Sequence, residues 1–415
     1  MHFKVLDLFA GCGGLSFGAL EAGHKVVAAV EADKWACDTY AFNLPSVDLF
    51  RSRLEDITFA RLREFRGIVN LVVGGPPCQG FSVSGKRQYG EHLPSNNLVF
   101  EFVRVIRAVA PNFFMLENVG GLKSYRLDKQ PLLRTLAELF GRLGYRLYTQ
   151  VLQAADYGIP QIRSRLFIVG TRIPLRYDPF PTPTHSSKPT RSLKPYLTVG
   201  DAILDLPPLK SGEGSDSAQP YTSSALTRFQ REMRHVSSGV FNHQAMKHSA
   251  ALVDRFRALK PGECAYRIGR QPSSDGDRPV TKYKTNNQRL ILDQPSLCVT
   301  ANFQSTFVHP VQPRNLTARE AARLMSFPDR FVFKGRRTLM SSSLLVAEGR
   351  HAENHLSQYN QIGNAVPPRL AALLVSHLAE VLSCKSGVTH LPRIVDQLDL
   401  DLPSGGRVWH EAAIR

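Results

Sequence analysis

The sequence is poor in the patterns that mark secreted, metal-binding or membrane proteins. Only six cysteines occur among 415 residues, without the spacing of a metal site or a disulfide framework. No apolar run approaches the ~20 residues that cross a bilayer. The first residues enter an expected strand directly, which leaves no room for a signal peptide. These absences predict a reduced, cytoplasmic protein without a metal or a membrane span.

Acidic residues are also scarce relative to basic ones. Lys and Arg number 52 against 35 Asp and Glu, which gives a formal net charge of +17. This balance favours a polyanionic partner, with nucleic acid first and an anionic membrane surface second. The apolar fraction of 43% and the charged fraction of 21% are those of a soluble globular protein. The length allows two domains, or one large domain with an insertion.

The first 172 residues alternate short apolar runs with segments of helical periodicity. The expected strands are residues 3–9, 25–30, 68–73, 112–116, 146–152 and 166–171, and the expected helices are residues 15–22, 34–43, 97–110 and 132–142. This alternation predicts an α/β fold with a doubly wound, mostly parallel sheet and helices on both faces. Ligands of such sheets bind beyond the carboxyl ends of the strands, so we expect the functional site there.

The composition changes near residue 172. Residues 171–290 carry 19 Lys and Arg against 10 Asp and Glu and are rich in Pro, Ser and Thr, which predicts a smaller, basic, irregular domain. Order resumes near Leu316, where Thr317 and Glu320 form an expected capping box, and a final helix is expected over residues 368–382. The expected organisation is a first domain at 1–172, a second at 173–285, a return to the first at 286–383, and a peripheral tail at 384–415.

A glycine-rich turn follows the first expected strand. Gly11, Gly13 and Gly14 let backbone amides approach a ligand closely, ahead of a helix whose N-terminus adds a favourable dipole. Glu31 ends the second strand, where a carboxylate can accept both ribose hydroxyls, and Asp56 follows a third, weak strand, where it can accept from an adenine amino group. The absence of a following Lys-Ser/Thr pair favours an adenosine-bearing cofactor without a triphosphate. The alternative is a plain tight turn with a solvated Glu31.

A second turn, Gly74–Ser82, follows the apolar run of residues 68–73 with the sequence Gly-Gly-Pro-Pro-Cys-Gln-Gly-Phe-Ser. Its two glycines and two prolines end the strand and place Cys78 at the edge of the sheet. A cysteine there is a candidate nucleophile, because thiolates are soft and are available near neutral pH at sites that stabilise them. From this motif alone, the alternative is a buried cysteine that only packs.

Taken in order, these and four further blocks resemble the DNA (cytosine-5) methyltransferase family. Asp7–Gly14 looks like its S-adenosylmethionine loop, Glu31 like its ribose acid and Gly74–Ser82 like its nucleophile loop. The further blocks are Glu117-Asn118-Val119, similar to the catalytic glutamate motif, Gln161–Arg165, similar to the two-arginine motif, Leu316–Asp329, similar to the supporting helix, and Gln361–Pro368, similar to the closing motif. The resemblance spans residues 5 to 380 approximately and fails only in the variable segment near 172–285 and in the tail.

The resemblance implies a class I methyltransferase fold, which is Rossmann-like, with the variable segment as a target-recognition domain. It implies S-adenosyl-L-methionine as cofactor, double-stranded DNA as partner, and neither metal nor membrane. It permits a monomer in the bacterial cytoplasm that forms a restriction–modification system with a cognate restriction endonuclease. The residues it assigns to the cofactor are Phe9, Ala10, Gly11, Gly13, Gly14, Leu15, Glu31, Ala32, Asp56, Ile57, Gly74, Pro76, Leu98, Asn364 and Ala365. Those assigned to DNA are Gln79, Ser82, Ser84, Lys86 and Gln161.

The catalytic roles expected from this chemistry fall on Cys78, Glu117, Arg163 and Arg165. The thiolate of Cys78 adds to carbon 6 of cytosine, and carbon 5 then attacks an electrophilic methyl group. Glu117 donates at ring nitrogen 3 as a general acid. The two arginines project to one face of a strand, where either fixes the cytosine carbonyl oxygen or holds Glu117 and a phosphate. Because a duplex hides carbon 6, the target base must leave the stack and the loop after Cys78 must close over it.

Two other functions stay open: an RNA cytosine-5 methyltransferase, and a DNA-binding relative without catalysis. The long basic segment favours duplex DNA over RNA. The presence of Cys78, Glu117, Arg165 and Asn364 argues against a silent relative. One departure from the family is the link of residues 335–357, which is longer than usual and suggests an extra contact with DNA or a partner.

Overall fold

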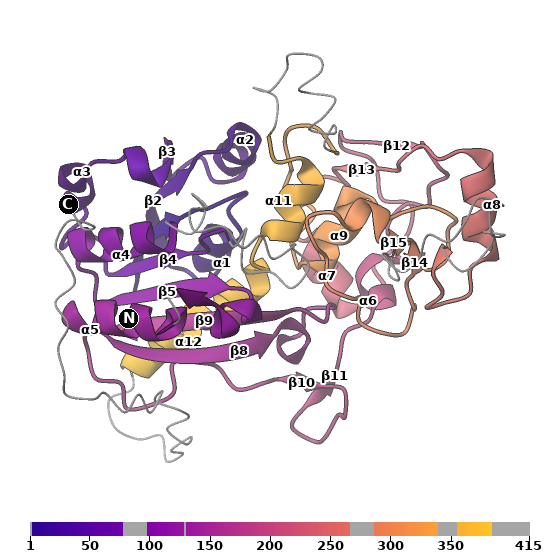
Figure 1. Cartoon of the computed structure of the whole chain (residues 1–415). Helices are drawn as coiled ribbons and strands as arrows, with labels where there is room; N and C mark the ends of the chain where they lie inside the picture. The colour runs from indigo at the N-terminus through magenta and orange to yellow at the C-terminus, as the bar shows by residue number, and fades with distance from the viewer. Residues whose placement is uncertain (1, 78–97, 128–129, 266–285, 339–354, 384–415) are drawn as a thin grey trace, which may run out of the picture.

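The computed structural model describes residues 2–77, 98–127, 130–265, 286–338 and 355–383. Within them, seven strands form one sheet in the order β3-β2-β1-β4-β5-β9-β8 (Figure 1). The strands are β1 (Lys4–Leu8), β2 (Lys25–Glu31), β3 (Asp48–Arg51), β4 (Leu71–Gly74), β5 (Phe113–Asn118), β8 (Arg146–Gln153) and β9 (Ser164–Thr171). Each strand expected from the sequence is present, with its ends shifted by a few residues.

The sheet is mostly parallel, as predicted, and β9 is the exception. β9 runs antiparallel to both of its neighbours, β5 and β8. The chain passes from β8 to β9 through residues 154–163, where a 3₁₀ turn over Ala154–Tyr157 ends at Gly158 in the left-handed region (φ 72°). A parallel connection needs a crossover of about a dozen residues or more, usually with a helix. This shorter, non-helical return therefore gives an antiparallel strand.

Helices cover both faces of the sheet, as predicted. The helices of this first lobe are α1 (Gly14–Glu21), α2 (Lys34–Asn43), α3 (Phe59–Arg63), α4 (Leu98–Val109), α5 (Leu132–Arg142) and α12 (Pro368–Ser383). Neighbouring residues of β1 point into different cores. Val5 belongs to the core that contains Leu15 of α1 and Leu370 of α12, whereas Leu6 belongs to the core that contains Phe102 of α4. This two-residue alternation of the strand separates the α1–α12 face from the α4 face.

The last described helix packs against the first. A Cβ added to Gly18 of α1 would lie 2.4 Å from the carbonyl oxygen of Pro368 and 2.6 Å from the Cβ of Ala371. A larger residue is therefore excluded at this contact. Residues 358–383 are, by length and composition, apolar enough to cross a membrane, but half of the most apolar window is buried inside the protein. The apolar face of α12 is explained by its contact with α1.

A second lobe, formed by the described residues between 173 and 338, lies beside the sheet (Figure 1). Its described elements are β10 (His185–Ser186), β11 (Lys194–Pro195), α6 (Val199–Ile203), β12 (Gly214–Ser215), α7 (Arg228–Arg234), β13 (His243–Gln244), α8 (Ala250–Ala258), β14 (Gln288–Arg289), β15 (Phe307–Val308) and α9 (Ala318–Leu324). Outside this lobe, β6 (Arg126–Leu127) pairs with β7 (Gln130–Pro131), and α11 (Gln358–Asn364) precedes α12. The lobe is irregular, with two-residue strands and short helices, and α9 packs against α6 and β13.

The domain limits expected from the sequence, at residues 172, 285 and 383, stay predictions.

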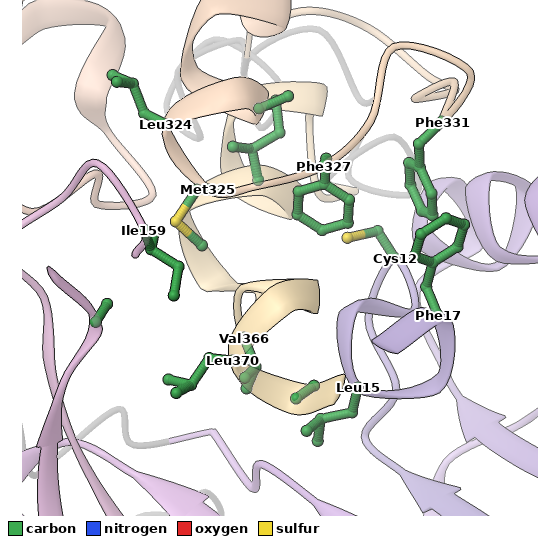
Figure 2. Packing of buried hydrophobic residues seen from close by; sticks show 14 of the residues in the cluster. Cys12, Leu15, Phe17, Ile159, Leu324, Met325, Phe327, Phe331, Val366 and Leu370 are labelled. Carbon is green, nitrogen blue, oxygen red and sulfur yellow. The ribbon is translucent and has the colours of Figure 1, made fainter. Parts of the chain in front are cut away.

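One hydrophobic core joins the two lobes. Phe327 and Phe331, which follow α9, lie near Cys12 and Phe17 of the first lobe (Figure 2). The rings of Phe17 and Phe331 meet edge to face, with centroids 5.2 Å apart. Aromatic pairs in this geometry contribute about 0.5–1.5 kcal/mol beyond the area they bury. The second lobe is therefore packed against the sheet domain through apolar side chains.

Charged side chains are buried where α9 meets α6. The capping box of Thr317 and Glu320 at the start of α9 is present, as predicted. Arg323 donates to the two carboxylate oxygens of Asp329 at 2.8 and 2.6 Å, and it also donates to Asp205. All three side chains are fully buried. Removing one partner from such a set leaves an uncompensated buried charge, which costs far more than the intact pair contributes.

Replacing Arg323 by leucine should lower the free energy of unfolding by about 3 kcal/mol, the lower end of the range for breaking a buried pair. We expect the lower end because Asp205 and Asp329 each keep a second hydrogen-bond donor. Denaturant unfolding measures the loss. The matched control is Arg228→Leu, which breaks an exposed ion pair and should have little effect. Equal losses in the two variants would contradict this role of Arg323.

Candidate active site

A cavity of about 700 Å³ opens at the carboxyl ends of the parallel strands. Its walls come from the loop after β1, the ends of β2 and β5, the turn after β4, and the beginning of β9. Residues much later in the chain complete it, namely Ala301, Asn302, Leu356, Gln361 and Gly363–Val366. This is the position expected for the ligand of a doubly wound sheet. Of the residues assigned to the cofactor from the sequence, those on the wall are Phe9, Ala10, Gly11, Gly14, Leu15, Glu31, Ala32, Pro76, Leu98, Asn364 and Ala365.

The remaining four residues assigned to the cofactor do not line the cavity, namely Gly13, Asp56, Ile57 and Gly74. Gly13 has φ 96°, and a Cβ there would lie 3.0 Å from the ring of Tyr40. This glycine therefore allows the conformation of the loop and its close contact with Tyr40. Gly74 is buried at the end of β4, where a Cβ would press on the backbone of β1. Glu55 lies on the wall where the sequence analysis expected Asp56.

The carboxylate of Glu31 is held by three backbone amides. Its Oε2 accepts from the amide of Gly11 at 2.7 Å, and its Oε1 accepts from the amides of Ala32 and Asp33 at 2.8 and 2.7 Å. Burial raises the pKa of Glu31, and these hydrogen bonds oppose the rise. A carboxylate has about four acceptor sites, so one remains for a donor in the cavity. Glu31 is thus a positioned acceptor rather than a freely solvated side chain.

Glu117 is the residue before the last of β5 and forms an ion pair with Arg165 on the cavity wall. The antiparallel register of β5 and β9 brings Nε of Arg165 to 3.1 Å from Oε1 of Glu117, and both side chains are mostly buried. Burial raises the pKa of Glu117, while the positive charges of Arg165 and Arg163 oppose the rise. A Cβ on Gly75 would lie 3.0 Å from Oε2 of Glu117. The turn after β4 therefore passes directly against this carboxylate.

Arg163 also lines the cavity, but its guanidinium bonds to the protein itself. Nη1 donates to the carbonyl of Val299 at 2.8 Å, and Nη2 donates to the carbonyls of Gly363 and Ala365 at 3.0 Å each. Burial lowers the pKa of Arg163 to about 10, which still leaves it a cation at neutral pH. Arg163 precedes β9 and Arg165 lies within it, so their shared strand face stays a prediction; both line the cavity and contact different groups. Arg163 holds the closing motif, and Arg165 holds Glu117.

Gln161 lies inside the protein rather than on a surface that faces DNA. Its side chain is fully buried. Nε2 donates to the carbonyl of Leu324 at 3.2 Å, and Oε1 accepts from the amide of Val299 at 2.8 Å. This amide therefore ties the turn before β9 to the end of α9. A spacing pattern could not reveal this, because the partners lie far away in the sequence.

The predicted nucleophile Cys78 and the predicted DNA contacts Gln79, Ser82, Ser84 and Lys86 lie outside the described residues. Pro77 and Leu98, on either side of that gap, both line the cavity. Sequence reasoning missed Asn302 and Leu356 on the wall, since neither stands in a motif. Among the residues that the structure describes, no three His, Cys, Asp or Glu side chains gather in a group that could hold a metal ion.

The chain is similar to known proteins over almost its whole length. The family model described as C-5 cytosine-specific DNA methylase matches residues 3–380. The type II methyltransferase M.DdeI of Desulfomicrobium norvegicum is 40% identical over 384 residues, which cover 91% of this chain and 88% of the relative. The type II methyltransferase M1.HphI of Haemophilus parahaemolyticus is 35% identical over 376 residues, which cover 89% of this chain and 85% of the relative.

Solved structures share the architecture. A prophage-encoded protein of E. coli, described as a DNA modification methyltransferase, superposes with a TM-score of 0.68 at 26% identity and covers 92% of this chain and 99% of its own. The Dnmt2 methyltransferase of S. pombe has a TM-score of 0.52 at 17% identity and covers 92% of this chain and 100% of its own. The second similarity shows the fold alone.

Replacing Arg165 by methionine removes the cation beside Glu117 while filling a similar volume. We expect the pKa of Glu117 to rise further, because burial raises it and Arg165 is the largest opposing charge. Infrared titration of the carboxyl stretch in protein with labelled glutamate measures the shift, and a Glu117→Gln sample identifies the band. Arg172→Met, which removes a cation stacked on the ring of Tyr145, should leave the band unchanged. An unaltered or lowered Glu117 pKa in the Arg165 variant would contradict this prediction.

Proposed function

The chain belongs to the C-5 cytosine-specific DNA methylase family and is a DNA cytosine-5 methyltransferase, and we propose how its cavity carries out the reaction. S-adenosylmethionine is the methyl donor of this family. The observation that carries the proposal is the position of Glu117, which is paired with Arg165 at 3.1 Å and lies against Gly75. Gly75 is three residues before Cys78. The turn that leads to the nucleophile therefore passes beside the acid.

The residues of the cavity fit an adenosine-bearing methyl donor. The cavity volume of about 700 Å³ lies within the range of small-molecule sites, roughly 300–1,000 Å³. Glu31 keeps one acceptor site that a ribose hydroxyl can fill. Phe9 and Leu15 offer apolar surface from the loop after β1, and Asn364 offers a polar side chain from the closing motif. When bound, the cofactor supplies an electrophilic methyl group.

The side chains of this enzyme prepare the cytosine. The thiolate of Cys78 forms a bond to carbon 6, and the electron pair of the 5,6 double bond shifts towards carbon 4, which places negative charge on ring nitrogen 3. Glu117 donates to ring nitrogen 3, and its raised pKa favours the protonated form that this donation needs. Once carbon 5 has taken the methyl group, water removes its proton. The 5,6 double bond then forms again as the thiolate of Cys78 leaves, and nitrogen 3 returns its proton to Glu117.

Arg163 and Arg165 hold other groups of the site in place. Arg165 orients Glu117, and Arg163 fixes the wall that the closing motif contributes. The target base reaches this site only after leaving the duplex, because carbon 6 is inaccessible in the stack. The loop from Cys78 to Arg87, which includes Ser82, Ser84 and Lys86, is proposed to close over the flipped base.

The basic residues of 173–285 are proposed to read the DNA site. Residues 171–290 contribute nine of the 17 excess positive charges of the chain. Arginine and lysine read guanine in the major groove, and asparagine and glutamine read adenine. Because relatives such as M.DdeI and M1.HphI are type II methyltransferases, we place the chain as the modification component of a restriction–modification system. It would act there as a monomer in the cytoplasm, beside a cognate endonuclease.

Bisulfite sequencing tests the activity and its site together. DNA incubated with the purified enzyme and S-adenosylmethionine should contain protected cytosines at one short, recurring sequence. Transfer RNA treated in the same way should contain none. Protection confined to RNA, or none on either substrate, would overturn the proposal.

Replacing Cys78 by serine should lower the turnover number by roughly a thousandfold or more, as expected when a covalent nucleophile is lost. Specific DNA binding should be retained, because a single oxygen replaces a sulfur. The wild-type enzyme should also form a stable covalent complex with 5-fluorocytosine DNA, since fluorine cannot leave as a proton. Cys264→Ser, at a partly exposed cysteine that does not line the cavity, serves as control and should retain full activity. Substantial turnover by the Cys78 variant would reject this mechanism.

A further inference from the structure

The long link of residues 335–357 begins and ends beside α2. The amide of Gln358 donates to the carbonyl of Arg336 at 2.8 Å, and its side-chain amide donates to the carbonyl of Gly335 at 3.1 Å. Gly335 lies against Trp35 of α2, where a Cβ would approach Cγ of the indole to 2.6 Å. The two described ends of the link are thus fastened to each other and to α2.

Asp33 joins the end of this link to α2. Its Oδ1 accepts from the amide of Ala36 at 2.9 Å, which caps the helix. Its Oδ2 accepts from the amide of Leu356 at 2.9 Å and lies 3.3 Å from Nδ1 of His355. The imidazole of His355 also contacts the ring of Trp35, with centroids 5.3 Å apart. One carboxylate therefore stabilises both the helix start and the returning chain.

The returning chain is part of the cavity. Leu356 lines it together with Ala32 and Gln361. The amide of Leu356 donates to Asp33, and its carbonyl accepts from Nε2 of Gln361 at 2.8 Å. Both backbone polar groups of this wall residue are thus bonded to side chains. The amide of Asp33 in turn donates to Glu31, the carboxylate assigned to the ribose.

We propose that His355 and Asp33 are positioning residues that hold Leu356 against the cofactor, so that the end of the long link sets cofactor affinity in this chain. The inference rests on the proposed placement of S-adenosylmethionine in the cavity. A wall residue that is already fixed loses less conformational freedom when the cofactor binds, and its apolar side chain is buried without rearrangement. Neither residue touches the reacting atoms.

The test compares S-adenosylmethionine binding and steady-state rates in His355 variants. His355→Ala should raise the dissociation constant and the KM for S-adenosylmethionine about three- to tenfold, as expected for one partly exposed polar contact with a charged group. The kcat, the affinity for cognate DNA and the melting temperature without cofactor should stay unchanged. His355→Asn should restore most of the affinity, because its amide nitrogen can take the place of Nδ1 beside the Asp33 carboxylate. His235→Ala, at an exposed histidine of the second lobe, is the matched control.

Glu31→Ala, measured beside these variants, distinguishes a wrong positioning role for His355 from a wrong placement of the cofactor. If Glu31→Ala weakens binding and His355→Ala does not, the positioning role is wrong while the cofactor site stands. If neither variant weakens binding, the proposed cofactor placement fails. If His355→Ala also lowered kcat, the affinity for DNA and the melting temperature without cofactor, the inference would be overturned, since such changes indicate a general structural role. A selective change in KM with rescue by asparagine supports it.

Discussion

The guanidinium of Arg163 donates to carbonyl oxygens that lie 136 to 202 residues further along the chain. Burying a cation is costly unless each donor finds an acceptor, and three backbone carbonyls meet most of that requirement here. The cation persists because burial lowers its pKa only to about 10. The beginning of β9 is thereby fixed to the closing motif, and the walls of the cavity keep their spacing. Asn364, which lines that wall, lies between the two residues of the closing motif whose carbonyls accept from Arg163.

The reversal of β9 explains why the two arginines reach the cavity at all. In an antiparallel strand, the beginning of β9 lies beside the carboxyl end of β5, the edge where ligands of such sheets bind. A parallel strand would have placed Arg165 at the opposite edge, away from Glu117. The same geometry leaves Glu117 between two opposing effects, because burial favours its neutral form and the neighbouring cations favour its charged form. A carboxyl group balanced in this way is suited to proton donation.

Much of the first lobe could be predicted from sequence because its signals are local. Strand periodicity, the glycine turn and the capping box of Thr317 and Glu320 each depend on neighbouring residues, and the structure confirms them. The direction of β9 and the burial of Gln161 depend on segments far away in the chain. Glu55 rather than Asp56 lies on the wall because of the 3₁₀ turn Leu54–Asp56. Such a short turn has no sequence periodicity from which the direction of each side chain could be predicted. Spacing also could not show that Arg163 bonds to carbonyls and Arg165 to a carboxylate.

The contact between α1 and α12 has a consequence for biosynthesis. The loop after β1 leaves the ribosome first, whereas Gly363–Val366 and α12, which complete the cavity and cover Gly14 and Gly18, come near the end of the described chain. A nascent chain that stops before them leaves Gly14 and Gly18 of α1 uncovered and lacks one wall of the cofactor site. The cavity therefore keeps an open side until Gly363–Val366 have been synthesised and have folded against α1. A product truncated before these residues has an incomplete cofactor site.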